Sequence, residues 1–229
     1  MIRDAFVCLL ALSNAATAIE TDVCVVGGGS GGVSAALAAA RAGARVVVVE
    51  RLHQLGGTST SGYVSSWEPG PGDLHAREFY DRLCRIGGAG ITSDQNPARK
   101  QGPFGLWLIT PQVRYEETLR RANIPYGQCH GVVFDPEKMS RVMAELLGET
   151  GRCQVLLNTR FVSAEHDGRR VTAIKAEAKD GTVHRIQAKG FVDATGNVDL
   201  CRAVGCETML GAEPKSRFDE PSAPSEGNR

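Results

Sequence analysis

Near the start of the chain, two short apolar runs flank a segment of small residues. The first run is Val23 to Val26, and the second extends from Arg45 to Val49. Uninterrupted apolar runs of this length are typical of strands that are buried on both faces of a sheet. The residues between them suit a helix that lies close to such strands: Ala35, Ala36, Ala38, Ala39, Ala40 and Ala42. The pattern predicts a strand, a helix that ends at Gly43 and a second strand.

A helix with one apolar face is predicted after Asp135. Its apolar residues recur at intervals of three and four, which places them along one side of a helix: Met139, Val142, Met143, Leu146 and Leu147. Asp135 is a favourable cap, and Pro136 suits the first helical position. Gly151 is expected to close this helix. The run from Cys153 to Leu157 then predicts a strand that returns to the sheet.

Three further strands are predicted near residues 160–166, 170–178 and 182–188. They are separated by the pairs Asp167-Gly168 and Asp180-Gly181, and such pairs favour the tight turns of β-hairpins. Strands joined by short turns form an antiparallel meander. A last strand, Phe191 to Ala194, is expected to re-enter the parallel sheet and to end at Thr195-Gly196.

Residues 63–133 interrupt this pattern and are interpreted as a helical insertion. One helix is expected to start at the cap Asp73 and to run to Ile86. Its apolar face should pack in the core and consists of Phe79, Tyr80, Leu83 and Ile86. A second helix is expected to start at Pro111, with Thr110 as its cap.

Composition argues against several classes of function. Lys and Arg number 26, as do Asp and Glu, so the formal net charge is zero. No field of the whole chain therefore attracts nucleic acid or an anionic membrane, and we expect no nucleic-acid partner. The five histidines are scattered, and the seven cysteines include no C-x-x-C pair. We expect no metal site, and we interpret the cysteines as buried free thiols.

The first eighteen residues have some features of a secretory leader. An apolar stretch from Ala5 to Leu12 follows Arg3, and Ala16-Thr17-Ala18 offers small residues at the spacing that signal peptidases prefer. The stretch is too short to span a bilayer. Asp4 weakens the basic region, so two interpretations stay open. Residues 1–18 are a signal peptide of a periplasmic or secreted protein, or an N-terminal extension of a cytoplasmic one.

A glycine cluster, residues 27–32, joins the first predicted strand to the first predicted helix. In the pattern G-x-G-x-x-G, the first glycine permits a tight turn, the second lets the backbone approach a pyrophosphate, and the third lets the helix pack on the sheet. These positions are Gly27, Gly29 and Gly32. Free N–H groups at the helix start then face the phosphates. Glu50 follows the second strand, where a carboxylate accepts hydrogen bonds from an adenosine ribose. The sequence predicts a dinucleotide site.

The loop after Glu50 contains a glycine pair and four hydroxyl side chains. The glycines are Gly56 and Gly57, and the hydroxyl residues are Thr58, Ser59, Thr60 and Ser61. Such a loop can donate hydrogen bonds along an extended cofactor. A flexible polar connector is the alternative interpretation.

Taken together, these segments resemble the FAD-dependent oxidoreductases of the glutathione reductase structural class. More narrowly, they resemble the group related to fumarate reductase flavoprotein subunits. The matching segments are Gly27-x-Gly29-x-x-Gly32, Glu50-Arg51, Leu55 to Ser59, the later helix and meander, and Asp193-Ala194-Thr195-Gly196 with Asp199 beyond. The resemblance implies an α/β fold of the Rossmann-like FAD/NAD(P)-binding kind, with a parallel sheet, an inserted helical segment and a three-stranded antiparallel meander.

The resemblance also implies roles for the matched residues. Those that would hold the FAD pyrophosphate are Gly27, Gly29, Gly31 and Gly32. Glu50 would bind the adenosine ribose, and Arg51 would lie on the adenine side. The residues that would run beneath the pyrophosphate, ribityl and isoalloxazine parts are Gly57, Thr58 and Ser59. Val162 would offer backbone atoms to adenine, and Gly196 would let the chain pass close to the cofactor.

Members of the resembled family are usually longer than this chain, which suggests the following division. Residues 1–18 are the possible signal peptide, 19–62 the FAD-binding βαβ unit and glycine-rich loop, 63–133 the helical insertion, 134–210 the remainder of the FAD-binding domain, and 211–229 a polar tail at the start of a missing C-terminal half. That half, or a second copy in a homo-oligomer, is the expected protein partner.

The leading functional hypothesis is an FAD-dependent oxidoreductase, or its N-terminal part, that transfers a hydride between flavin and an unknown small-molecule substrate. One alternative is a non-catalytic dinucleotide-binding fragment or binding module. Another is an NAD(P)-dependent dehydrogenase, which the meander and the loop at Gly57-Thr58 disfavour. No catalytic residue is assigned, because the part of the family that binds substrate is not seen in this sequence and no base and nucleophile lie at a diagnostic spacing. Asp193 and Asp199 are interpreted as turn or helix-cap residues.

Overall fold

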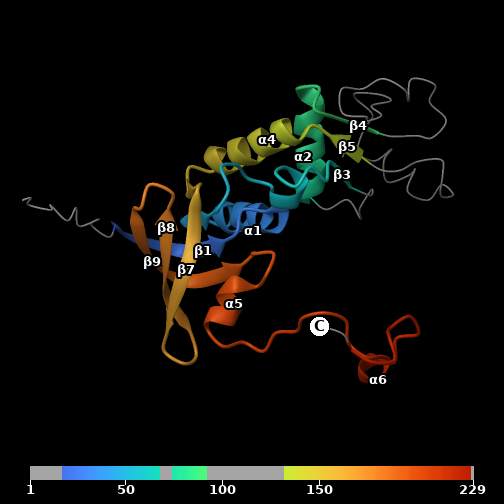
Figure 1. The fold of residues 1–229 in the computed structure, drawn as a ribbon. Coiled ribbons are helices and arrows are strands. Elements are labelled where there is room, and N and C mark those ends of the chain that lie inside the picture. The colour runs from blue at the N-terminus through green and yellow to red at the C-terminus, as the bar shows by residue number, and fades with distance from the viewer. Residues whose placement is uncertain (1–16, 68–73, 92–131, 228–229) are drawn as a thin grey trace, which may run out of the picture.

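The computed structural model describes residues 17–67, 74–91 and 132–227. Its main sheet has six strands in the order β6-β2-β1-β9-β8-β7. Their bounds are β1 Thr17–Val26, β2 Val46–Val49, β6 Cys153–Leu156, β7 Thr159–His166, β8 Val171–Ala178 and β9 Val183–Asp193. The neighbouring pairs β6-β2, β2-β1 and β1-β9 are parallel, whereas β9-β8 and β8-β7 are antiparallel. The α/β fold expected from the sequence is confirmed (Figure 1).

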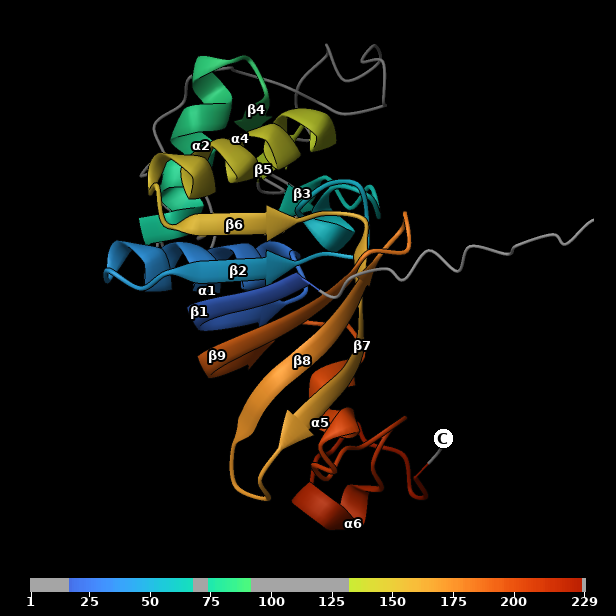
Figure 2. The ribbon, with the colours of Figure 1, turned by 90° about the vertical axis from the view of Figure 1, so that its left-hand side faces the viewer.

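Three helices lie on one side of the main sheet, and the second of them packs chiefly on the third (Figure 2). They are α1 Ser30–Arg41, α2 Leu74–Arg85 and α4 Pro136–Glu149, with a small sheet of β3 Ser66–Trp67, β5 Val132–Phe134 and β4 Ala89–Ile91. Val25 and Val48 pack against the helices, whereas Cys24 and Val47 belong to a second cluster on the opposite face. The short helix α5, Asp199–Ala203, adds Leu200 to that cluster. Both faces of the parallel strands are therefore covered, as their apolar runs predicted.

The local signals around α4 are confirmed. The Asp135 side chain caps the helix, because it accepts hydrogen bonds from the N–H groups of Glu137 (2.9 Å) and Lys138 (3.1 Å). The predicted apolar stripe is buried: Met139, Val142, Met143, Leu146 and Leu147. Gly151, with φ of +62°, ends the segment in the left-handed region that favours glycine.

The strands expected at residues 182–188 and 191–194 are wrong as separate elements, since both belong to β9. On one edge β9 pairs with β8, and on the other it pairs with β1 over most of its length. Gly190 continues the ladder opposite Val23, so the backbone bonds carry the strand across the gap that was expected between the two strands. The meander is thus part of the main sheet.

Ile86 is not a core residue as expected, because its side chain is 37% exposed. Helix α2 ends before it, where Gly87 takes a φ of +63° and the Gly88 N–H donates to the carbonyl of Leu83 (2.7 Å). The rest of the expected face is buried: Phe79, Tyr80 and Leu83. The expected cap Asp73 and the helix expected from Pro111 lie outside the described residues.

The two ends of the described chain differ in their surroundings. Ala18, the last residue of the predicted leader, lies in β1 and pairs with Arg185 of β9. The segment after α5, which contains α6 Lys215–Phe218, runs away from the sheet and is largely exposed (Figures 1 and 2). Within the described ranges, no helix is both long enough and apolar enough to cross a membrane.

Candidate functional site: a cavity at the glycine turn

A cavity of about 710 Å³ lies at the carboxyl ends of β1, β2 and β9. Its walls come from the turn after β1, the end of β2, the loop at Gly57, the start of β7 and the turn after β9. From β1 the chain passes to β2 on one side, while β9 lies on the other. Ligands of open α/β sheets bind at such switch points, and this volume is within the range of small-molecule and cofactor sites.

Two glycines of the turn are required by packing. Gly27 has a φ of +102°, and a Cβ there would lie 2.4 Å from the carbonyl oxygen of Ala194. A Cβ on Gly32 would lie 1.9 Å from the carbonyl oxygen of Gly27. These contacts press the start of α1 against the ends of β1 and β9. They explain why the first and third glycines of the motif accept no side chain.

Gly29 and Gly31 instead face open space. A Cβ at either position would meet no atom within 4 Å, and both residues line the cavity. Gly29 is the N-cap of α1, it provides no side-chain cap hydrogen bond, and no acidic residue lies in the first turn of the helix. The first N–H groups of the helix and the positive end of its dipole are therefore available to an anionic ligand.

The loop after Glu50 is docked on the glycine turn. The Gly56 N–H donates to the carbonyl of Gly28 (2.8 Å), and the hydroxyl oxygens of Ser30 and Ser59 are 3.0 Å apart. Buried Thr60 donates its hydroxyl to the carbonyl of Leu55 (2.6 Å). Gly56 leads into a 3-10 turn, Gly57–Ser59, and two residues of this turn, Gly57 and Thr58, line the cavity. The loop is thus a fixed wall rather than a free connector.

Glu50 occupies a more constrained place than its spacing indicated. Its side chain lines the cavity but is only 5% exposed. One carboxylate oxygen accepts the N–H of Gly28 (2.6 Å), and the other accepts the N–H of Leu52 (2.7 Å). Each oxygen keeps a second lone pair that a ribose hydroxyl could use. Glu50 therefore fastens the glycine turn to the end of β2, and Arg51 beside it also lines the cavity.

The predicted contacts with adenine and with the later chain have different outcomes. Gly196 lines the cavity, as do its neighbours in the turn after β9. Val162 lies inside β7 at an irregularity in the pairing with β8, and it is not part of the cavity wall. The preceding residues of β7 provide that wall: Thr159, Arg160 and Phe161. These residues were not predicted, because their place at the sheet edge depends on how β7 pairs there.

Asp193 organises the turn after β9. It accepts hydrogen bonds from the N–H and hydroxyl of Thr195 (3.0 and 2.7 Å) and from the N–H of Cys201 (2.9 Å). Partial burial raises the pKa of Asp193, but the bonds from Cys201 and Thr195 outweigh it and hold the pKa below its usual range. Asp199 lies in the first turn of α5 and donates its N–H to the Thr195 hydroxyl (2.7 Å), while Val198 is the N-cap. Both acids thus belong to a turn, although Asp199 itself is not the cap.

Within the described residues, no group of three or more His, Cys, Asp or Glu side chains is placed to hold a metal ion. A family model for FAD dependent oxidoreductases matches residues 22–227. The chain belongs to the FAD dependent oxidoreductase family. The family resemblance inferred from the sequence is confirmed, and the cofactor of this family is FAD.

Curated relatives share part of their length with this member of the family. A dihydrolipoyl dehydrogenase of Trypanosoma brucei brucei is 34% identical over 127 residues, which are 52% of this chain and 25% of that protein. A soluble pyridine nucleotide transhydrogenase of Erwinia tasmaniensis is 24% identical over 179 residues, which are 78% of this chain and 31% of that protein. The chain thus spans a quarter to a third of these relatives.

Solved structures agree on the fold of this oxidoreductase family member. AlpK gives a TM-score of 0.53 at 21% identity, covering 85% of this chain and 35% of its own. A geranylgeranyl bacteriochlorophyll reductase-like protein of Thermoplasma acidophilum gives 0.51 at 20% identity, covering 84% and 44%. At such identities the likeness establishes the arrangement of the sheet and helices.

Proposed function

We propose that this chain binds FAD in the cavity at the glycine turn and forms the cofactor-binding part of an oxidoreductase. The observation that carries the proposal is the uncapped start of α1, which opens on the cavity between Gly29 and Gly31. A diphosphate fits this place because backbone N–H groups and the helix dipole complement its charge. Family membership supplies the identity of the dinucleotide.

The cavity wall suits the successive parts of the cofactor. Residues that would hold the diphosphate and the ribityl chain are Gly29, Ser30, Gly31, Gly57 and Thr58, with Ser59 fixing Ser30. Glu50 would accept hydrogen bonds from the ribose while it keeps its two backbone partners. Arg51 and the start of β7 would surround the adenine, and Gly196 would leave room for the chain after β9.

Bound flavin supplies hydride chemistry at N5 of its ring. The described residues of this chain would bind and orient the cofactor and exclude water from one side of it. The substrate is proposed to be a small molecule, contacted by protein beyond the described residues, either a C-terminal half or a second subunit. The curated relatives, which are three to four times longer than their matched parts, support this division.

Cofactor titration of the purified full chain tests the proposal. We expect saturable binding of FAD, with the absorbance and quenched fluorescence of a bound flavin, and no comparable binding of NAD⁺ or NADP⁺. Tight NAD⁺ binding without flavin would instead favour a nicotinamide-dependent dehydrogenase. A monodisperse chain that binds none of them would favour a non-catalytic fragment.

A further inference from the structure

The end of α5 brings two cysteines together. After α5, Gly205 adopts a φ of +77°, and its N–H donates to the carbonyl of Arg202 (3.1 Å). The Cys206 N–H donates to the carbonyl of Cys201 (3.0 Å). These two bonds are those of a Schellman motif, in which the side chains on either side of the longer bond commonly touch. Here both of those side chains are thiols.

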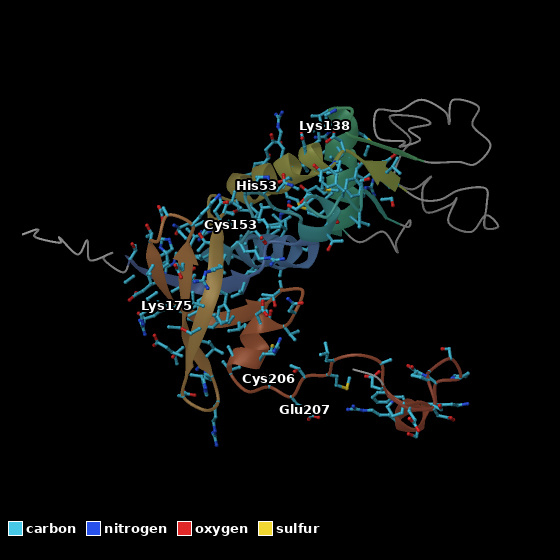
Figure 3. All side chains as sticks on the ribbon, in the orientation of Figure 1. His53, Lys138, Cys153, Lys175, Cys206 and Glu207 are labelled. Atoms are coloured by element: carbon cyan, nitrogen blue, oxygen red, sulfur yellow. The ribbon has the colours of Figure 1, made fainter. Side chains whose placement is uncertain are left out.

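The two thiols differ in their surroundings. Cys206 is exposed, and Figure 3 labels it beside the end of α5, whereas Cys201 is half-buried. Partial burial raises the pKa of the Cys201 thiol, and hydrogen bonds and charge from Asp193 and from Cys206 raise it further. The backbone bond from the Cys206 N–H to the Cys201 carbonyl (3.0 Å) keeps the two side chains next to each other. Cys206 is the accessible thiol of the pair, and Cys201 is the protected one.

Other cysteines of the described residues lie in different settings. Cys24 is buried in β1, and burial raises the pKa of its thiol to about 12. The thiols of Cys84 and Cys153 lie 3.8 Å and 3.9 Å from backbone carbonyl oxygens, those of Ala89 and Ala36. These three thiols are placed as packed, reduced side chains. They therefore serve as internal controls for the Cys201–Cys206 pair.

We propose that Cys201 and Cys206 form a reversible intrachain disulfide by exchange with a low-molecular-weight disulfide of the glutathione class. The Cys206 thiolate attacks one sulfur of that molecule, so a mixed disulfide forms and the first small thiol leaves with a proton from solvent. Cys201, after giving its proton to solvent, attacks the Cys206 sulfur and displaces the second small thiol. Two electrons thus pass from the protein thiols to the small disulfide, which becomes two thiols.

The disulfide would act on the cavity wall through Asp193. In the reduced chain this carboxylate accepts hydrogen bonds from the N–H of Cys201 and from Thr195, and the neighbouring Cys201 thiol helps to hold its pKa below the usual range. Oxidation replaces that thiol with a disulfide sulfur, which has no proton to donate, and keeps the backbone donor. Because Thr195 lines the cavity, the redox state of the pair changes the support of the turn after β9. Formation of the disulfide itself does not require bound FAD, so its test is independent of the proposed function.

Trypsin provides a direct assay on the full chain, because Arg202 lies between the two cysteines. Cleavage yields peptides 190–202 and 203–215, each with one cysteine of the pair. The reduced chain is incubated with glutathione at graded ratios of oxidised to reduced form, with and without FAD. Free thiols are then alkylated, the chain is digested with trypsin, and the masses of the peptides are measured by mass spectrometry. We expect the two peptides to become linked, with loss of two hydrogen atoms, and to separate again with dithiothreitol.

Two variants make this result decisive. Cys206→Ser should abolish the link and leave Cys201 open to alkylation, whereas Cys153→Ser, the matched control, should leave the link intact. Circular dichroism of both variants checks that they fold. The proposal fails if both peptides stay alkylated at every glutathione ratio. It also fails if Cys206 is recovered only as a mixed disulfide with glutathione or bridged to Cys206 of a second chain.

Discussion

At Gly29 the backbone tolerates a side chain but the proposed ligand does not. Its φ and ψ of −67° and 179° are open to any residue, and an added Cβ meets no atom within 4 Å. We therefore expect Gly29→Val to unfold at the wild-type temperature but to bind FAD at least about tenfold more weakly, or about 1.4 kcal/mol. Flavin titration and thermal unfolding measure the two effects.

The matched control for this variant is Gly190→Val. Gly190 also has open space around its Cβ position, but it lies in β9 outside the cavity wall. Its substitution should leave FAD affinity unchanged. Full flavin occupancy in Gly29→Val would contradict a diphosphate at the start of α1.

Gly32 and Gly31 are neighbours with opposite tolerances for a methyl group. In Gly32→Ala the new Cβ would overlap the carbonyl oxygen of Gly27, so we expect a loss of about 1–3 kcal/mol in the free energy of unfolding. Gly31→Ala meets no atom and removes a poor helix former, so it should unfold at wild-type or slightly higher urea concentration. Equal unfolding midpoints for the two variants would refute the close contact between α1 and the turn.

Glu50 joins structure and binding, so its substitution needs two measurements. Glu50→Ala leaves the N–H groups of Gly28 and Leu52 without their acceptor, which costs about 1–3 kcal/mol of stability for a buried group. On the fraction that stays folded, the affinity for FAD should fall by about 1.5–3 kcal/mol, the scale of a hydrogen bond to a charged group. Urea unfolding and calorimetric titration report the two losses.

Glu145→Ala is the control for Glu50, because Glu145 lies outside the cavity wall and forms an exposed ion pair with Arg141 on α4. Neither its stability nor its FAD affinity should change by more than about 0.5 kcal/mol. If Glu50→Ala loses stability but keeps its affinity, Glu50 only fastens the turn to β2. The ribose assignment would then be removed.

At the scale of elements, the start of α4 is a local signal with a measurable energy. Asp135→Ala removes the acceptor for two N–H groups of the first turn, and we expect a loss of about 1 kcal/mol. Asp135→Asn keeps a capping oxygen and should lose only a fraction of that. Urea unfolding of both variants checks the difference, and an equal loss would point to charge rather than capping.

Elements that depend on neighbours in sequence were the ones that the sequence predicted. Some signals act within a few residues and can therefore be recognised in the sequence: the cap at Asp135, the apolar stripe of α4, and the turn glycines Gly43 and Gly151. The sequence did not predict that β9 is one continuous strand, because this continuity depends on pairing with β1, more than a hundred residues earlier. Propensity at Gly190 indicates a break, and the ladder overrides it.

The candidate site divides in the same way. Gly27, Gly29 and Gly32 were identified with their separate roles because the motif is contiguous. The backbone partners of Glu50 were not identified, since Gly28 lies across the sheet edge from it. Likewise, the Thr159–Phe161 wall depends on how β7 leaves that edge, which no local pattern encodes.

At the scale of the whole molecule, carboxylates clamp strands that are distant in sequence. Asp22 of β1 pairs with Lys189 of β9 (2.8 Å) and accepts the N–H of Arg45 just before β2 (2.9 Å). These bonds, first that from Lys189, lower the pKa of Asp22 from 3.8 to about 2. Ion pairs and turn hydrogen bonds also hold the pKa of other carboxylates below their usual ranges, as at Glu149, Glu165, Asp167 and Asp180.

The sign of the resulting pH dependence follows from these lowered values. A carboxylate whose pKa is lower in the folded chain stabilises it fully above the unfolded pKa and loses that contribution as pH falls through the folded pKa. For Asp22 this window runs from 3.8 down to about 2. We expect the urea midpoint to fall steadily across it. Asp22→Asn cannot titrate, so its decline should be shallower. An acid decline as steep as that of the wild type would show that the β1–β9 clamp contributes nothing to stability.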